Sequence, residues 1–170
     1  MYTISRRSLA LLALLAAAAL TAACGTSNTT VTPHAANGRV AAIGLRTDAG
    51  LGTILVDSHG RTLYLFRRDA PGQSTCTGAC AAAWPPLRES SAPLAGTGLR
   101  PALLGLIRRS DGRSQVTYNR HPLYLFSGDT SSGQTSGQGV NAFGGLWYAL
   151  APSGAAVTGP GPTSVNGHGY

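Results

Sequence analysis

The sequence predicts an all-β fold, in which one small antiparallel domain is built from two pseudo-repeats. Short runs rich in β-branched and aromatic residues alternate with turn-forming residues, as is typical of strands joined by tight turns. The heptapeptide Leu-Tyr-Leu-Phe-Arg-Arg-Asp at 63–69 returns as Leu-Tyr-Leu-Phe-Ser-Gly-Asp at 123–129, which marks an internal repeat. The length of 170 residues leaves room for one domain of ordinary size.

Both halves of the repeat have the same expected order of elements. A turn containing Gly60 joins the first pair of strands, and Asp111-Gly112 supplies the positive φ of a tight hairpin in the second half. A short helical turn is expected within 76–83, before two prolines stop it. Each half then reaches a tryptophan, Trp84 or Trp147. The expected strands lie at 53–56, 62–66, 103–109, 114–119, 122–126 and 146–150.

Residues 1–23 have the composition of a signal peptide. Arg6 and Arg7 precede an apolar run at 9–20, and three small residues follow it. The run is too short to remain as a membrane-spanning helix. The paired arginines resemble the twin-arginine export signal, which leaves both that route and the general export route open.

The segment Leu-Thr-Ala-Ala-Cys at 20–24 resembles the bacterial lipobox, which implies that Cys24 is acylated and becomes the N-terminus of a protein anchored to the cell membrane. The alternative is an unmodified cysteine. Acylation of Cys24 would leave Cys76 and Cys80 as a pair, as an exported protein favours. We therefore expect a lipidated N-terminus and flexible linker at 24–38, the β domain at 39–152 and a disordered tail at 153–170.

The chain is basic, with thirteen arginines, no lysine and six acidic residues, a formal net charge of +7. Loss of the leader removes two of the arginines. A basic domain held at an anionic membrane surface is attracted to it. The arginines are scattered singly or in pairs, without a basic helix or a stacking array, so no nucleic-acid partner is expected.

The repeated heptapeptide places aromatic and acidic side chains at matching positions. Alternation along a strand sends the tyrosine and phenylalanine to one face and the leucines to the other, which predicts central strands with two apolar faces. The simplest role for the tyrosines is a buried ring with a bonded hydroxyl, and for the aspartates a turn that accepts backbone N–H groups. The alternative is a ligand-facing platform. These positions are Tyr64, Phe66, Asp69, Tyr124, Phe126 and Asp129.

Cys76 and Cys80 are four residues apart, close enough for a disulfide across one helical turn. A structural staple is the simplest interpretation. The alternative is a redox pair or soft-metal site that handles copper, with His59 or His121 completing the ligand set.

The usual catalytic motifs are missing, and Glu89 is the only glutamate, so we expect neither an enzyme nor a cofactor. An enzyme would need a cleft around the two tyrosine and aspartate motifs.

Several motifs occur together in one order. These are the lipobox, two copies of Tyr-x-Phe-x-x-Asp, Cys76-Thr-Gly-Ala-Cys80, Trp84-Pro-Pro-Leu and Gly-Gly-Leu-Trp147-Tyr. Over about residues 40 to 152 the chain resembles the bacterial lipoproteins with a Yx(FWY)xxD motif, also called the secreted repeat of unknown function. The resemblance implies no settled activity, substrate or cofactor. We expect a membrane-anchored extracytoplasmic lipoprotein with a non-enzymatic binding or structural role toward an envelope protein or small ligand.

Overall fold

The structure is a computed structural model that describes residues 42–159. The expected signal peptide, Cys24, the whole of the expected linker and residues 160–170 lie outside these residues. The elements, in chain order, are β1 (Ala42–Asp48), β2 (Gly52–Val56), β3 (Tyr64–Phe66), α1 (Ala79–Ala83), β4 (Leu94–Ala95), the 3-10 turn η1 (Pro101–Leu103), β5 (Leu104–Arg108), β6 (Ser114–Tyr118), β7 (His121–Pro122), β8 (Asn141–Ala142) and β9 (Gly145–Ala149).

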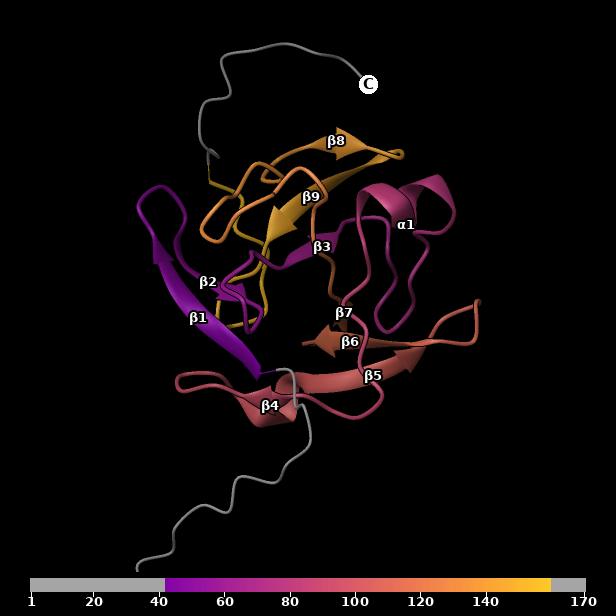
Figure 1. The fold of residues 1–170 in the computed structure, drawn as a ribbon, viewed down its shortest axis with the longest axis horizontal. Helices are drawn as coiled ribbons and strands as arrows, with labels where there is room; N and C mark the ends of the chain where they lie inside the picture. Colours follow the sequence, from indigo (N-terminus) through magenta and orange to yellow (C-terminus); the bar gives the residue numbers. More distant parts are fainter. Residues whose placement is uncertain (1–41, 160–170) are drawn as a thin grey trace, which may run out of the picture. The chain divides into compact units, whose positions relative to one another are not determined.

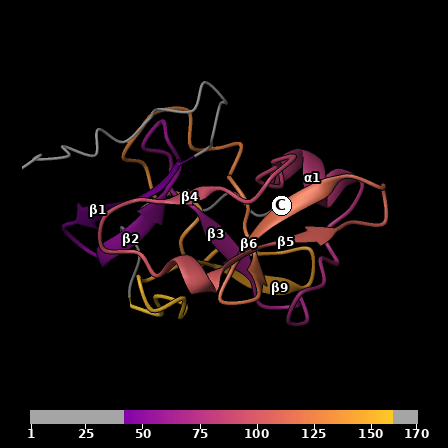
Figure 2. The same ribbon diagram turned by 90° about the horizontal axis from the view of Figure 1, so that it is seen from below.

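The strands form three small sheets, which confirms the all-β prediction (Figure 1). Their strand orders are β2-β1-β4, β3-β9-β8 and β5-β6-β7. All pairings within them are antiparallel except that of β1 with β4. Figure 2 shows the β1–β2 hairpin at one side of the domain, the β5–β6 hairpin at the other and β3 between them.

The second repeat departs from the expected strand at 122–126. Strand β7 ends at Pro122, and Tyr124 instead forms isolated bridges with Tyr64 and with Pro86. The residues therefore stay extended without belonging to a regular ladder. Strands β1, β4 and β8 were not predicted from the sequence, and the helix begins later than expected, at Ala79.

The side chains on the two faces of the repeated strands belong to two separate buried clusters, as the alternation of side chains along a strand predicts. Leu63 and Leu65 belong to one cluster, together with Leu123 of the second repeat. Tyr64 and Phe66 belong to the other, which contains both tryptophans and both described cysteines. Each cluster draws on both repeats, so neither half has a core of its own.

The two repeats meet backbone to backbone at their tyrosines. The amide of Tyr64 donates to the carbonyl of Tyr124 at 2.8 Å, and the amide of Tyr124 donates back to the carbonyl of Tyr64 at 2.9 Å. Strand β9 adds to this exchange, because it pairs with β3 of the first repeat, Phe66 lying opposite Trp147. The junction thus places equivalent residues of the two repeats around one point.

The domain continues beyond residue 152, where we expected the disordered tail to begin. The amide of Ala151 donates to the carbonyl of Ala155, and the amide of Val157 donates to the carbonyl of Ala149. These bonds extend the sheet edge along β9, so the expected boundary was several residues too early. Among residues 42–159, no helix has the length and apolar character needed to cross a membrane.

Candidate functional site

The candidate site is the junction of the repeats, where the tyrosine of each motif bonds to the aspartate of the other. The hydroxyl of Tyr64 donates to Oδ2 of Asp129 at 2.6 Å, and the hydroxyl of Tyr124 donates to Oδ2 of Asp69 at 2.6 Å. Oxygen–oxygen distances this short are typical of bonds to a charged acceptor. The two motifs therefore form one reciprocal arrangement.

Each aspartate reaches its position through a tight turn after the motif's phenylalanine. The amide of Asp69 donates to the carbonyl of Phe66, and the amide of Asp129 donates to the carbonyl of Phe126, both at 3.1 Å. Oδ1 of Asp69 then accepts the amide of Thr75 at 2.7 Å, and Oδ1 of Asp129 accepts that of Ser136 at 2.9 Å.

The sequence interpretation of the aspartates was therefore incomplete. Their carboxylates do accept backbone N–H groups, but from residues six and seven positions later rather than from the adjacent turn. One oxygen of each carboxylate closes its own loop and the other holds the opposite repeat.

The two tyrosine hydroxyls differ in what they accept. The oxygen of Tyr64 accepts the amide of Gly137 at 3.3 Å. The oxygen of Tyr124 lies 2.7 Å from Oγ of Ser74. Oγ of Ser74 also accepts a hydrogen bond from Nη1 of Arg109. A guanidinium can only donate and a carboxylate can only accept. Protons therefore point one way along the chain, from Arg109 through Ser74 and Tyr124 to Asp69.

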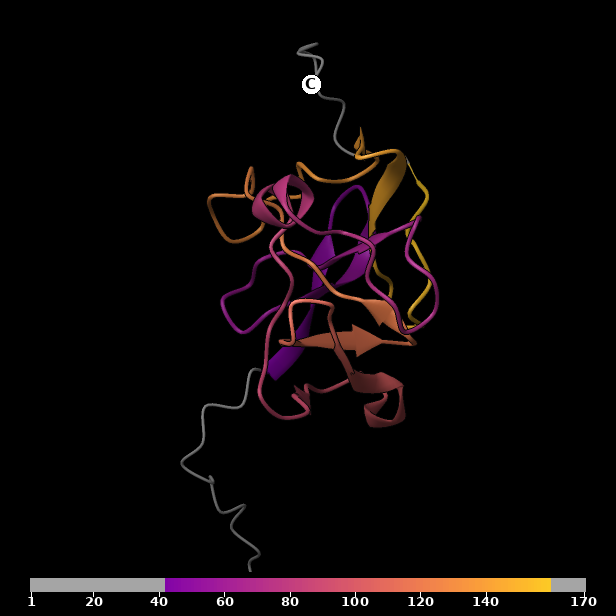
Figure 3. The ribbon, with the colours of Figure 1, turned by 90° about the vertical axis from the view of Figure 1, so that its right-hand side faces the viewer.

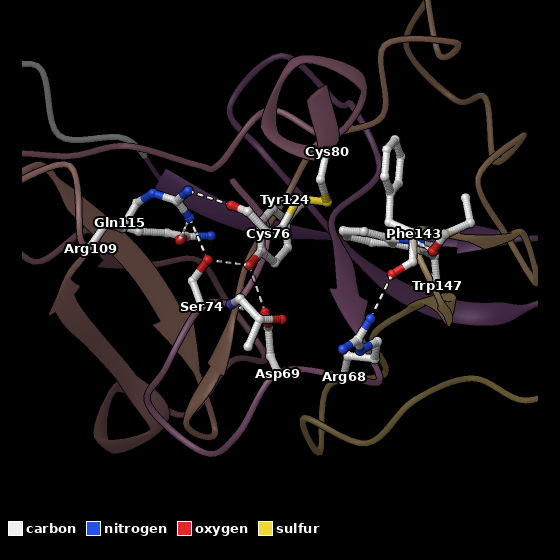
Figure 4. Close-up of a disulfide and its surroundings, with 12 residues drawn as sticks. Arg68, Asp69, Ser74, Cys76, Cys80, Arg109, Gln115, Tyr124, Phe143 and Trp147 are labelled. Atoms are coloured by element: carbon white, nitrogen blue, oxygen red, sulfur yellow. Dashed lines mark hydrogen bonds between the residues drawn. A yellow bond between two sulfur atoms is a disulfide. The ribbon is translucent and has the colours of Figure 1, made fainter. Parts of the chain in front are cut away.

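Arg109 is a buried guanidinium that the sequence did not single out. Its residue is 6% exposed, and it donates to Oε1 of Gln115 and to the carbonyl of Cys76, both at 2.6 Å (Figure 4). Gln115 in turn donates to the carbonyl of Leu123 at 2.8 Å. A buried charge is tolerated when it is bonded in this way. The signal in the sequence was alternation, which turns one arginine of the pair at 108–109 inward.

Four aromatic rings stack in one continuous column at the junction. Phe66 lies on Trp147 with ring centroids 4.1 Å apart, the two tryptophans lie 3.9 Å apart, and Trp84 lies 4.3 Å from Phe126. Each phenylalanine thus stacks on the tryptophan of the other repeat. This is the offset or parallel contact through which aromatic pairs add to apolar burial.

The tyrosines close the sides of the column. Tyr64 packs its edge against Trp84 and Tyr124 packs its edge against Trp147, with interplanar angles of 82° and 87°. Both tryptophans and both tyrosines are almost fully buried. The two tyrosines and the two tryptophans therefore present no open ring face to a ligand, while Phe126 at the end of the column is partly exposed.

Burial raises the pKa of both tyrosines well above the ordinary value. In each case the hydrogen bond and the negative charge of the opposing aspartate, Asp129 for Tyr64 and Asp69 for Tyr124, raise the pKa further. The phenols stay protonated through the physiological range. Both phenols therefore remain hydrogen-bond donors to the opposing aspartates.

The described cysteines form a disulfide beside this network. Cys76 and Cys80 are bonded, with Cα atoms 5.2 Å apart, and their residues are 1% and 6% exposed. Reactive cysteine pairs need an accessible sulfur, so this geometry matches the predicted staple. Copper handling would first require reduction to free thiolates. Within residues 42–159, no three His, Cys, Asp or Glu side chains gather as a metal site.

The second repeat replaces the disulfide by close packing of a glycine. A Cβ atom on Gly137 would lie 2.9 Å from atoms of Trp84 and of Tyr64. Two shallow hollows on the described surface lie elsewhere, one lined by Arg88 and Arg113 and the other by His59 and Arg61. Neither is lined by a motif residue. The hydrogen bonds between the motif residues join the two repeats to each other.

Comparison with known proteins finds a match to one family. A family model described as a secreted repeat of unknown function matches residues 46–88 and 105–151, more than half of the chain. The two matches fall on the two repeats described above. No curated protein and no solved structure matches the chain.

Proposed function

Since the chain belongs to the family of secreted repeats of unknown function, we propose that it is an extracytoplasmic lipoprotein, held on the cell membrane by an acylated Cys24, whose two-repeat domain is a non-enzymatic binding or structural element of the envelope. Family membership itself indicates a secreted protein. The lipid anchor and the role of the domain are the steps that we add.

The anchor is supported by the leader and by the cysteine count. A basic start, a short apolar run and small residues precede Cys24, in the order of a lipoprotein signal peptide. Of the three cysteines in the chain, Cys76 and Cys80 are bonded to each other, so Cys24 is the one left for a lipid. A lipid on Cys24 spares the exported protein a reactive thiol.

The non-enzymatic role is carried by a single observation, the reciprocal bonding of the motifs. Tyr64 with Asp129 and Tyr124 with Asp69 use their polar atoms on each other, inside the domain. General acid or base chemistry requires such groups to reach a substrate. Binding by this domain is therefore proposed for its surface, with the motif residues supplying rigidity.

Mass spectrometry of the protein purified from its native envelope tests the anchor. We expect an N-terminus at Cys24 that carries a diacylglyceryl group, and a membrane fraction from which a high-salt wash releases the Cys24→Ser variant but not the parent protein. Cys80→Ser is the matched control, which should leave the protein in the membrane fraction. An unmodified Cys24, or a Cys24→Ser variant that a high-salt wash does not release from the membrane, would refute the anchor.

The same sample tests the non-enzymatic role against the redox alternative. Alkylation of the native protein should label neither Cys76 nor Cys80, and metal analysis should find no stoichiometric copper or zinc. Rapid labelling of both thiols, or one bound metal ion per chain, would replace the structural interpretation by a redox or metal-handling one.

A further inference from the structure

The hairpin that joins β8 to β9 ends in an exposed aromatic residue. Ala142 pairs with Gly145, so Phe143 and Gly144 are the two residues of the turn. Phe143 is 43% exposed, and Leu146, early in β9, is 37% exposed. Two large apolar side chains therefore meet solvent within four residues of each other.

The backbone at this tip favours a different residue. Phe143 has φ 55° and Gly144 has φ 80°, which is the left-handed pair of a type I′ turn. Such turns prefer Asn-Gly, and a bulky residue with positive φ is a strained exception. Strain of this kind is retained where a side chain is needed for function rather than for folding.

Two arginines flank the tip, one on each face of the hairpin. The amide of Arg67 donates to the carbonyl of Leu146 at 2.9 Å, and the register of β3 with β9 places these two side chains on the same face. Arg68 lies over Gly145 on the other face and donates from Nη1 to the carbonyl of Phe143 at 3.2 Å (Figure 4).

The charge of these arginines is available to a partner. Both are exposed, and neither belongs to a salt bridge formed within residues 42–159. The nearest acidic residue in sequence, Asp69, already has its two carboxylate oxygens bonded to Thr75 and Tyr124.

We propose that Phe143 and Leu146, flanked by Arg67 and Arg68, form a second membrane contact that inserts into the surface of an anionic phospholipid bilayer. Aromatic and aliphatic tips bury themselves at the boundary between headgroups and acyl chains. Guanidinium groups beside them bind phosphate oxygens through paired hydrogen bonds and are drawn to anionic headgroups. The combination of apolar tip and unpaired cations fits a lipid surface.

The inference rests on the proposed anchoring of the domain, and the length of the tether permits it. The tip lies at the opposite end of the domain from β4, which pairs with the start of β1 (Figures 1 and 3). The residues from Cys24 to Ala42 span up to roughly 60 Å when extended. That length exceeds the roughly 13 Å radius of gyration of a domain of this size severalfold, so an anchored chain can turn its tip to the same membrane.

Vesicle binding by the mature chain from residue 24 with Cys24→Ser, which removes the acyl chains from the measurement, tests the contact. The vesicles contain equal amounts of phosphatidylglycerol and phosphatidylcholine, with pure phosphatidylcholine as the uncharged reference. The informative variant is Phe143→Asn, because asparagine suits the turn while removing the apolar side chain. Leu94→Ser is the matched control, since Leu94 is 62% exposed in β4.

We expect Phe143→Asn to weaken binding to the anionic vesicles by about tenfold, the loss of one partly buried aromatic side chain, while its melting temperature stays equal or rises. Arg67→Gln with Arg68→Gln should remove most of the difference between anionic and neutral vesicles. Unchanged binding by Phe143→Asn, no binding by the parent chain, or a larger loss on Leu94→Ser would overturn the proposal. Acylation of Cys24 is measured separately, so failure of the anchor is distinguishable.

Discussion

Replacing Tyr64 by phenylalanine is expected to lower the free energy of unfolding by about 3 kcal/mol. The ring keeps its contacts with Trp84, but the 2.6 Å bond to Asp129 is lost, and Asp129 is only 8% exposed. A hydrogen bond to a charged group contributes about 1.5–3 kcal/mol to stability. Because Asp129 is buried, losing its donor should cost a free energy near the upper end of that range. The amide of Gly137 also loses its acceptor.

The equivalent change in the second repeat should lower the free energy of unfolding by less. Which of the two variants loses more stability is a sharper test than either value alone. Tyr124→Phe removes the bond to Asp69, but Asp69 is half-buried and keeps both donors of Thr75. Water can replace part of the lost bond, so we expect about 1.5 kcal/mol.

Urea denaturation of the two variants measures both values, with an unchanged m-value showing that the transition is the same. A cost of less than about 0.5 kcal/mol for Tyr64→Phe, the size of an ordinary surface substitution, would show that the bond to Asp129 does not stabilise the fold. A larger cost for Tyr124→Phe than for Tyr64→Phe would show that the burial of the aspartate does not set the size of the effect.

The alkaline limb of the stability curve gives the same variants a second readout. The pKa of each tyrosine is raised in the folded state above the unfolded value of 10.0, because of burial first and the opposing aspartate second. Their contribution is complete below pH 10 and is lost as pH rises above it, by about 1.4 kcal/mol per unit and per tyrosine. Each phenylalanine variant should show a shallower loss above pH 10.

Three further predictions concern the surroundings of the junction. Gly137→Ala should cost about 2 kcal/mol by overpacking against the aromatic column, whereas Gly159→Ala, where a Cβ meets nothing within 4 Å, should change the melting temperature little. Replacing Cys76 and Cys80 by alanine should cost about 2 kcal/mol from loop closure, seen in urea denaturation, and should leave vesicle binding unchanged. Burial, and then the charge of Arg67, lower the pKa of His121 below its usual 6.5. As the pH falls below 6.5, His121 is protonated more readily in the unfolded chain than in the folded one, which lowers the free energy of unfolding. Between pH 7 and lower pH, the free energy of unfolding should therefore fall less in His121→Gln than in the parent.

The fold class and the motif residues could be read from the sequence because both depend on local patterns. Alternation separated Leu63 and Leu65 from Tyr64 and Phe66, and the structure places them in two different clusters. The repeat itself predicted that the two halves pack together. Neither inference needed knowledge of which distant residues touch.

The partners of those residues could not be read, because they come from the other repeat. Asp69 and Asp129 suggested local turns, and the bond of each to a tyrosine more than fifty positions away depends on the backbone bridge between the repeats. The sequence neighbours of Arg109 do not distinguish it from an exposed arginine. Its hydrogen-bond partners Ser74 and Cys76 lie more than thirty positions earlier in the chain. Two-residue strands such as β4 and β8 are set by tertiary contact rather than by propensity.

The exchange of hydrogen bonds between the motifs has a consequence for how such a chain can arise. In a polypeptide with one copy of the repeat, the buried phenol and the carboxylate would each lack a hydrogen-bond partner, because in this chain the partner of each comes from the second copy. Two separate copies could satisfy both by associating about a twofold axis, as symmetric homodimers do. The present chain carries both copies, so each buried group finds its partner within one molecule. The two copies are not identical, since one carries Cys76 and Cys80 and the other carries Gly137.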